Sequence, residues 1–263
     1  MTGIRRVIAV FGVACGVLAA WAPGLRAAAE VHRLSLVVSS NPTQIVGGDF
    51  NDFLSTYNRT VLAPRGLETL EKITTSWYYQ AELRFFVRPN VAVSAGLGQI
   101  RSSVHLEYLP RISQSIEHRA EVLTVPVHVG AAYYLAPYNQ GDFQARAYLG
   151  GGFMSYTANK AIFERTEAQT DTATTLGGNF KERGDRDAPG YYLEVGAHMF
   201  FAVRYSVMLG VIYRNALIRN LALTIDSTSP DGRVVTHRTL HTQPTLSLDM
   251  GGVGARMALG IGF

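Results

Sequence analysis

Cysteine is almost absent from this chain. The single residue of this type, Cys15, lies among the first 29 residues, so no disulfide and no cysteine-based metal cluster can form in the rest of the chain. After residue 29, no apolar run approaches the roughly 20 residues that a membrane-spanning helix needs. Metalloprotease, calcium-loop and dinucleotide-binding motifs are also lacking. We therefore expect no metal ion and no cofactor.

Charged residues are scarce too, at 17% of the chain, and the formal net charge is +4. The first 29 residues hold three of the 24 Lys and Arg and none of the 20 Asp and Glu, which leaves a net charge of +1 on the remainder. A nucleic-acid-binding protein would need a strong basic excess. We therefore expect no nucleic-acid partner.

The N-terminal segment has the features of a secretory signal peptide. Arg5 and Arg6 precede an apolar stretch over residues 7–20, and Ala27 and Ala29 supply the small side chains of a cleavage site. The sequence therefore predicts a signal peptide over residues 1–29 and one mature domain over residues 30–263. An uncleaved anchor is the alternative, but glycines, Pro23 and Arg26 interrupt or bound the apolar stretch.

Most of the remaining chain alternates with period two between apolar and polar or small residues. In residues 75–88, Trp77, Leu83 and Phe85 share one face, while Glu82 and Arg84 lie on the other. Charges at alternate positions fit a strand with lipid on one side and a polar interior on the other. The same pattern recurs in residues 31–41, 91–108, 121–136, 142–158, 190–204, 206–222 and 253–263. In residues 91–108 it loses phase near Gln99, which suggests a bulge.

The connections predict how about eight such strands are joined. Residues 89–90, 137–141 and 204–205 are short turns, while 45–74, 109–118, 165–189 and 225–240 are long and polar. Phe143 and Phe153, like Tyr191 and Phe201, are ten residues apart, which spans roughly 25 Å of membrane at ~3.3 Å per residue and ~40° tilt. We predict an all-β, up-and-down antiparallel transmembrane barrel with aromatic girdles. A soluble barrel would need polar outer faces.

Two of the long connections have a pattern of their own. Phe50, Phe53, Leu54 and Tyr57 follow Asp49 at helical spacing, so a short amphipathic helix is expected, with Asp49 as its N-cap and the barrel rim or membrane interface beneath it. Residues 229–232, Ser-Pro-Asp-Gly, predict a hairpin that extends two strands above the bilayer.

The chain resembles the small outer-membrane β-barrel family that includes the OmpA membrane domain and OmpX. The resemblance rests on residues 123–135, on residues 147–153 and on the C-terminal Phe263. It implies a cell outer-membrane location, a lipid environment and a monomer. It also implies that the barrel assembly machinery binds the terminal strand through Phe263, Ile261 and Leu259, which share one face with the other apolar residues of that strand.

Several polar side chains are predicted to face the lumen: Glu82, Arg84, His128, Arg146, Glu194, His198, Arg214 and Arg256. They could form a polar path or an anion site, because arginines outnumber glutamates. Alternatively they pair with one another in a packed interior, since an unpaired buried charge is strongly destabilising. We favour pairing, and Glu194 with Arg214 is the expected pair because the two lie diagonally on neighbouring strands.

Three functions remain open. We favour a non-enzymatic envelope protein with a closed or narrow lumen that acts through its extracellular loops, in surface contact or membrane integrity. The first alternative is a narrow channel for small solutes or hydrophobic molecules, as in OmpW-like barrels. The second is a lipid-A-modifying enzyme, which would need a nucleophile beside a histidine at the rim. The nearest such residues are Thr236, His237 and His241, and no catalytic residue is assigned.

Overall fold

The computed structural model describes residues 32–111, 114–140, 143–169, 187–201, 204–221, 223–228, 234–240 and 246–263. The predicted signal peptide with its cleavage site at Ala27 and Ala29 lies outside these ranges. Cleavage therefore stays a prediction. His241, named above for the enzyme alternative, also lies outside them.

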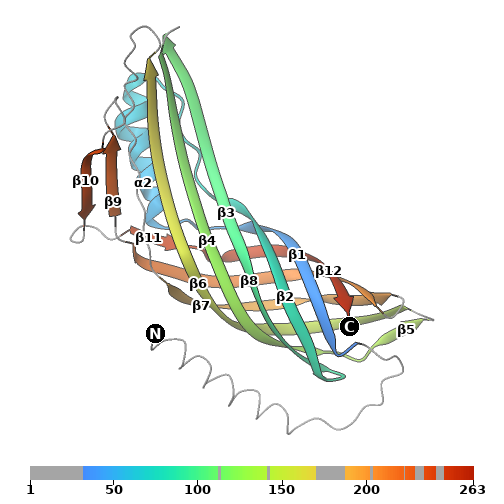
Figure 1. Ribbon diagram of the computed structural model, residues 1–263. Helices are drawn as coiled ribbons and strands as arrows, with labels where there is room; N and C mark the ends of the chain where they lie inside the picture. Colours follow the sequence, from blue (N-terminus) through green and yellow to red (C-terminus); the bar gives the residue numbers. More distant parts are fainter. Residues whose placement is uncertain are drawn as a thin grey trace.

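Eight antiparallel strands close into a barrel (Figure 1). They are β1 (Leu34–Gln44), β2 (Thr75–Arg88), β3 (Val91–Arg111), β4 (Gln114–Tyr134), β6 (Phe143–Gln169), β7 (Ala188–Phe201), β8 (Tyr205–Leu221) and β12 (Gly252–Gly262). Each pairs with the next of the eight, and β12 closes the ring by pairing with both β8 and β1. The predicted all-β up-and-down architecture is confirmed.

The described residues also include four shorter strands that are not part of the closed ring. β5 (Tyr138–Gln140) pairs with the start of β6, and β11 (Leu246–Asp249) pairs with the end of β8. β9 (Leu223–Thr228) and β10 (Val234–Leu240) form the predicted hairpin, whose turn lies outside the described residues. This hairpin is a separate two-stranded sheet and does not continue the barrel strands upward as expected.

The two faces of the barrel have opposite polarity. Outward side chains such as Leu83, Leu149 and Leu259 are exposed, whereas charged inward ones are buried. Phe143 and Phe201 stand side by side at one end of this apolar belt, with ring centroids 5.3 Å apart, and the paired residues Phe153 and Tyr191 mark the other. An even-stranded barrel with an apolar outer belt between aromatic girdles is a membrane-spanning barrel. No helix in the described ranges is long and apolar enough to cross a membrane.

Strand β3 contains no bulge at Gln99. Its register with β4 is unbroken from Leu97, opposite Val127, to Ile100, opposite Thr124. The pattern loses its apolar phase because the strand leaves the membrane there, so polar side chains take over the outward positions while the geometry stays regular. The expected bulge is therefore wrong.

Beyond the membrane, three of the eight barrel strands extend past the ends of the others and remain paired with one another. β2 pairs with β3 only as far as Arg101, and β7 pairs with β6 only as far as Tyr156. Residues 101–111 of β3, 114–123 of β4 and 157–169 of β6 thus form a three-stranded sheet, here called the wall (Figure 1). Residues 109–118, expected to be a long loop, are mostly the paired upper ends of β3 and β4.

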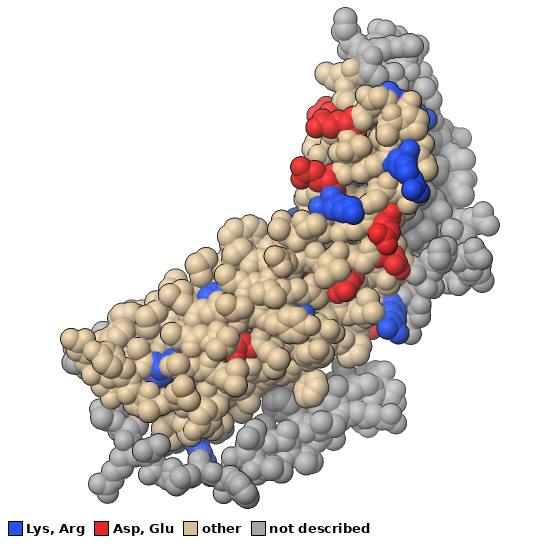
Figure 2. All heavy atoms as spheres, turned by 180° about the vertical axis from the view of Figure 1, so that it is seen from behind, with Lys and Arg blue, Asp and Glu red and all other residues tan. Residues whose placement is uncertain are grey.

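Charge follows this division between barrel and wall. On the face shown in Figure 2, most of the Lys, Arg, Asp and Glu atoms lie on the upper part of the molecule, and only a few are visible on the barrel surface below. The wall's outer face carries ion pairs from Glu121 to Arg101 and Arg119, at 2.7 and 2.6 Å, and a contact from His105 to Glu117 at 3.1 Å. The wall therefore projects into water and the belt into lipid.

The predicted helix is present as α2 (Asp49–Tyr57), which continues into η1 (Asn58–Leu62) and η2 (Ala63–Arg65). Its N-cap is Gly48 rather than Asp49, and no side chain caps it. Asp49 is instead the first helical residue, and its Oδ2 accepts hydrogen bonds from the backbone N–H and hydroxyl of Ser247 at 2.9 and 2.6 Å. A carboxylate at this position also suits the helix dipole.

Helix α2 packs against the inner face of the wall, and its first turn is joined to β11 at the upper end of the barrel through Asp49 and Ser247. Of the two expected positions, it therefore takes the barrel rim and not the membrane interface. Phe50, Leu54 and Leu62 are fully buried in a cluster with Ile100 of β3. Asn51 fixes the helix to the returning chain, because its side chain donates to the carbonyl of Ile73 at 2.8 Å and accepts from its N–H at 2.9 Å. The first long connection is therefore a built-in cover over the barrel.

The lipid-facing belt should tolerate an arginine substitution much less well than the water-exposed wall. Leu149→Arg, near the middle of the belt, should destabilise the barrel by about 2–4 kcal/mol because a cation would face hydrocarbon. Leu109→Arg, at an equally exposed position on the wall, should cost far less. Urea unfolding in phospholipid vesicles measures both, and equal losses for the two variants would contradict the assignment of the belt.

Candidate functional site: the charged layer of the lumen

All eight side chains predicted to face the lumen are buried within the barrel, each at most 3% exposed. They come from six strands: Glu82 and Arg84 from β2, His128 from β4, Arg146 from β6, Glu194 and His198 from β7, Arg214 from β8 and Arg256 from β12. The inward phase of each strand places them there, because the side-chain period of a strand is two.

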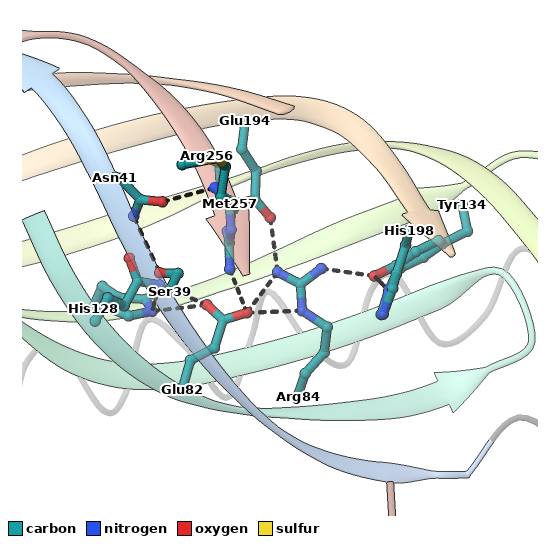
Figure 3. A network of polar contacts seen from close by, with 11 residues as sticks. Ser39, Asn41, Glu82, Arg84, His128, Tyr134, Glu194, His198, Arg256 and Met257 are labelled. Atoms are coloured by element: carbon teal, nitrogen blue, oxygen red, sulfur yellow. Dashed lines mark hydrogen bonds and ion pairs between the residues drawn. The ribbon is translucent and has the colours of Figure 1, made fainter. Parts of the chain in front are cut away.

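Four of these charges form one network across the lumen (Figure 3). Oε1 of Glu82 accepts from Arg84 Nε at 3.0 Å and from Arg256 Nη2 at 2.7 Å. Across the barrel, Oε1 of Glu194 accepts from Arg84 Nη2 at 2.9 Å, and its Oε2 accepts from Arg256 Nη1. Each carboxylate is thus held by both guanidiniums, and two negative charges balance two positive ones.

Further polar side chains complete the hydrogen bonding of the network. Oε2 of Glu82 accepts from Gln80 Nε2 at 2.8 Å and lies 3.3 Å from His128 Nε2. Arg84 Nη1 donates to the hydroxyl of Tyr134 at 2.7 Å, and that hydroxyl lies 3.1 Å from His198 Nδ1. Sequence reasoning left Gln80 and Tyr134 out of the cluster, although both occupy inward positions and carry a polar group.

The expected pair of Glu194 with Arg214 is wrong. The two residues do lie on neighbouring strands, with Glu194 opposite Ile212 and Arg214 opposite Tyr192. Arg84 and Arg256 reach Glu194 instead, because the narrow lumen lets side chains from distant strands meet. Strand adjacency is therefore a poor guide to pairing inside a barrel of this size.

Two arginines stand outside the network. Arg146 lies toward the short-turn end, where its Nε donates to Gln144 Oε1 at 2.8 Å and its Nη1 donates to the Pro89 carbonyl. Arg214 lies toward the wall and donates to the Thr43 hydroxyl. Neither forms an ion pair with a carboxylate of the described residues.

Inward glycines make room for these large side chains. A Cβ at Gly150 would come within 2.9 Å of Glu194 Oε1, and one at Gly130 would come within 2.1 Å of the Tyr192 hydroxyl. Real Cβ atoms do not approach other heavy atoms so closely. Glycine at these two positions therefore allows bulky groups to cross the lumen.

The four charges of this network, Glu82, Arg84, Glu194 and Arg256, are called the charged layer, and they lie between two apolar clusters. Toward the wall, Phe50, Leu54, Tyr78 and Ile100 belong to a large buried cluster. Toward the short turns, a second cluster includes Phe86 and also Tyr134 and Tyr148. Side chains therefore fill the described lumen at all three levels. No group of His, Cys, Asp or Glu in the described part of the chain is arranged to hold a metal ion.

Above the membrane, the cover is fastened to the wall at His118 of β4. Its Nε2 lies 2.9 Å from the Tyr57 hydroxyl of helix α2, and its ring stacks on Tyr108 with centroids 5.7 Å apart. Burial, together with the cations of Arg165 and Arg65, lowers the pKa of His118 to about 4. Burial raises the pKa of Tyr57. At neutral pH the imidazole is therefore uncharged, and its Nε2 can accept a hydrogen bond from the Tyr57 hydroxyl.

No family model and no curated protein matches the chain. Among solved structures, the chain is similar to the outer membrane protein OprG from Pseudomonas aeruginosa (TM-score 0.42, 9% identity), and the match covers 88% of this chain and 96% of that one. It is also similar to the N-terminal β-barrel domain of Pseudomonas aeruginosa OprF (TM-score 0.39, 10% identity, 88% and 98% covered). A third is the outer membrane protease OmpT from Escherichia coli (TM-score 0.30, 10% identity, 88% and 95% covered).

The depressed pKa of His118 predicts a pH-dependent stability. The unfolded chain, with an ordinary histidine pKa near 6.5, binds a proton that the folded chain resists until about pH 4. This contribution should leave stability unaffected above about pH 6.5 and lower it progressively as pH falls toward 4. His118→Phe, which keeps an aromatic ring but cannot titrate, should flatten the dependence.

The measurement is the thermal unfolding midpoint between pH 7 and pH 4.5 for the wild type, for His118→Phe and for the exposed-face control His105→Phe. The control should follow the wild type. An identical pH slope in all three proteins would show that His118 does not titrate as described.

Proposed function

We propose that this membrane-spanning barrel is a closed, non-conducting protein of the bacterial outer membrane, whose role in surface contact or membrane integrity lies in the wall and its covering helix. One observation carries the proposal: the lumen is packed through its height by a charged layer between two apolar clusters. A barrel of about eight strands is only wide enough for side chains to fill it.

The charged layer supports closure more strongly than apolar packing alone. Passage of an ion would require Arg84 or Arg256 to move away from the carboxylates. Each such movement would leave a buried charge without its partner, which is strongly destabilising. Two hollows border the barrel strands. One is lined mainly by outward-facing apolar residues such as Val38, Leu97 and Leu209 and faces the surrounding lipid, and the other includes Arg101 and Ser103 and lies at the upper edge of the belt. These features support a scaffold over the competing transport function.

The wall supplies the surface for contacts. Its inner face is apolar and covered by helix α2, while its outer face presents Arg101, His105, Glu117 and Arg119 to water. Strands hold these side chains in fixed register, which a loop of the same length would not do. Whatever this protein contacts outside the cell would meet a rigid, mixed-charge sheet standing on the membrane.

The exposed apolar residues of the terminal strand support a proposal about assembly. Leu259, Ile261 and Phe263 point outward from the terminal strand and are exposed, so the assembly machinery could bind them before the barrel closes. The Phe263 N–H then donates to the Leu34 carbonyl at 2.9 Å in the closed barrel. We propose that the folded protein is a monomer surrounded by lipid, and that it carries no catalytic site.

Single-channel recording tests closure directly. The wild type inserted into a planar bilayer should give no steady conductance. The double variant Glu82→Ala/Arg84→Ala, which removes a neutral pair of charges from the layer, should give measurable openings, because water could then enter the lumen. The matched control Arg101→Ala/Glu121→Ala removes an ion pair from the wall and should stay silent.

Insertion is checked separately by the mobility shift between unboiled and boiled samples on SDS gels. Steady, discrete conductance of the wild type would overturn the proposal and make the charged layer a selectivity region. Silence from a protein whose gel mobility shows a folded barrel supports closure.

A further inference from the structure

Arg214 is one of two lumen arginines outside the charged network, and unlike Arg146 it has guanidinium nitrogens without an acceptor among the described residues. It is fully buried, and it lies on β8 between the inward residues Ile212 and Ala216, which are 1% and 2% exposed. Both neighbours belong to the large apolar cluster beneath helix α2. Its guanidinium is therefore held in an apolar, water-poor part of the lumen.

The contacts of Arg214 satisfy only one of its nitrogens. Nη2 donates to the Thr43 hydroxyl and lies 3.4 Å from the Gln44 carbonyl. The guanidinium carbon lies 5.1 Å from the centre of the Tyr78 ring. Nε and Nη1 have no acceptor among the described residues, and the fully buried hydroxyl of Tyr78 has no partner there either.

No described carboxylate neutralises Arg214. Glu82 and Glu194 are shared between Arg84 and Arg256, so their two charges are already balanced. Asp249, on the adjoining strand β11, accepts the Gly251 N–H at 2.8 Å instead. The local excess is one positive charge.

An arginine cannot relieve this situation by losing its proton, because a guanidinium stays protonated in proteins. A buried cation without a counter-charge is strongly destabilising. The thermodynamically simple solution is a bound anion that carries one negative charge and accepts the free N–H groups. It must be small, because the interior of a barrel of about eight strands leaves little space.

We propose that Arg214, with the Tyr78 hydroxyl as a second donor, binds a small monovalent inorganic anion of the size of chloride in the upper lumen. The site is formed by β8 and β2, with Thr43 of β1 orienting the guanidinium. The anion neutralises the surplus charge of the upper lumen, at Arg214, and is a structural ligand of the closed barrel. This inference does not depend on whether the barrel conducts.

Bromide provides the first test, since it substitutes for chloride and scatters X-rays anomalously. The full-length protein is refolded and crystallised in sodium bromide with chloride excluded. An anomalous peak within hydrogen-bond distance of Arg214 Nε or Nη1 is the expected result. Only water at those atoms, or bromide solely at other positions, would overturn the proposal.

Thermal unfolding at constant ionic strength provides the second test, with chloride replacing the bulky anion gluconate. The wild-type midpoint should rise by about 3–6 °C for each tenfold increase in chloride above its Kd. Arg214→Gln should lose this response, whereas Arg219→Gln, an exposed outward position on the same strand, should keep it. An equal response in all three proteins would place chloride binding elsewhere. If Arg214→Gln does not fold, the crystallographic result on the wild type decides alone.

Discussion

The mutual neutralisation of two carboxylates and two guanidiniums in the middle of the lumen is the constraint on which the rest of this barrel depends. Glu82 and Glu194 are each bound by both Arg84 and Arg256, and all four are buried. Removing one member would leave its partners charged in a medium that solvates them poorly, a loss of about 3–5 kcal/mol. The network thus ties β2, β7 and β12 together across the barrel, in addition to the hydrogen bonds around its circumference.

The network also explains the distribution of other features. Inward glycines such as Gly150 allow Glu194 to reach the centre, and the apolar clusters above and below exclude water that would weaken the ion pairs. Helix α2 completes the upper cluster, and its link to the wall through Tyr57 and His118 keeps it in place. Closure of the lumen is therefore a joint property of the charged layer and the cover.

Much of the fold could be predicted because each barrel strand faces lipid on one side and the packed lumen on the other. Its sequence therefore alternates strictly between apolar and polar or small residues. Residues 75–88 coincide with β2, and the helix following Asp49 was found from its apolar spacing. The period becomes uninformative once a strand leaves the membrane. For this reason the sequence predicts a loop over residues 109–118, where β3 and β4 remain paired, and a bulge at Gln99, where only the polarity of the side chains changes.

The members of the charged layer could be predicted, but their partners could not. Phase alone places Glu194 and Arg214 inside, and strand order makes them neighbours. Which arginine reaches which carboxylate depends on the height of each residue along tilted strands and on the space that opposing glycines leave. Neither quantity is encoded in a local pattern, and the contribution of Tyr134, an aromatic residue with a polar tip, was missed for the same reason.

A double-mutant cycle on unfolding free energies tests the central claim most directly. Glu194→Gln combined with Arg256→Gln should show a coupling within the range of about 0.5–3 kcal/mol that contacting residues give, near its upper end because both groups are buried. Glu194→Gln combined with Arg214→Gln should be additive within about 0.5 kcal/mol. A strong coupling of Glu194 to Arg214 and none to Arg256 would contradict the network described here.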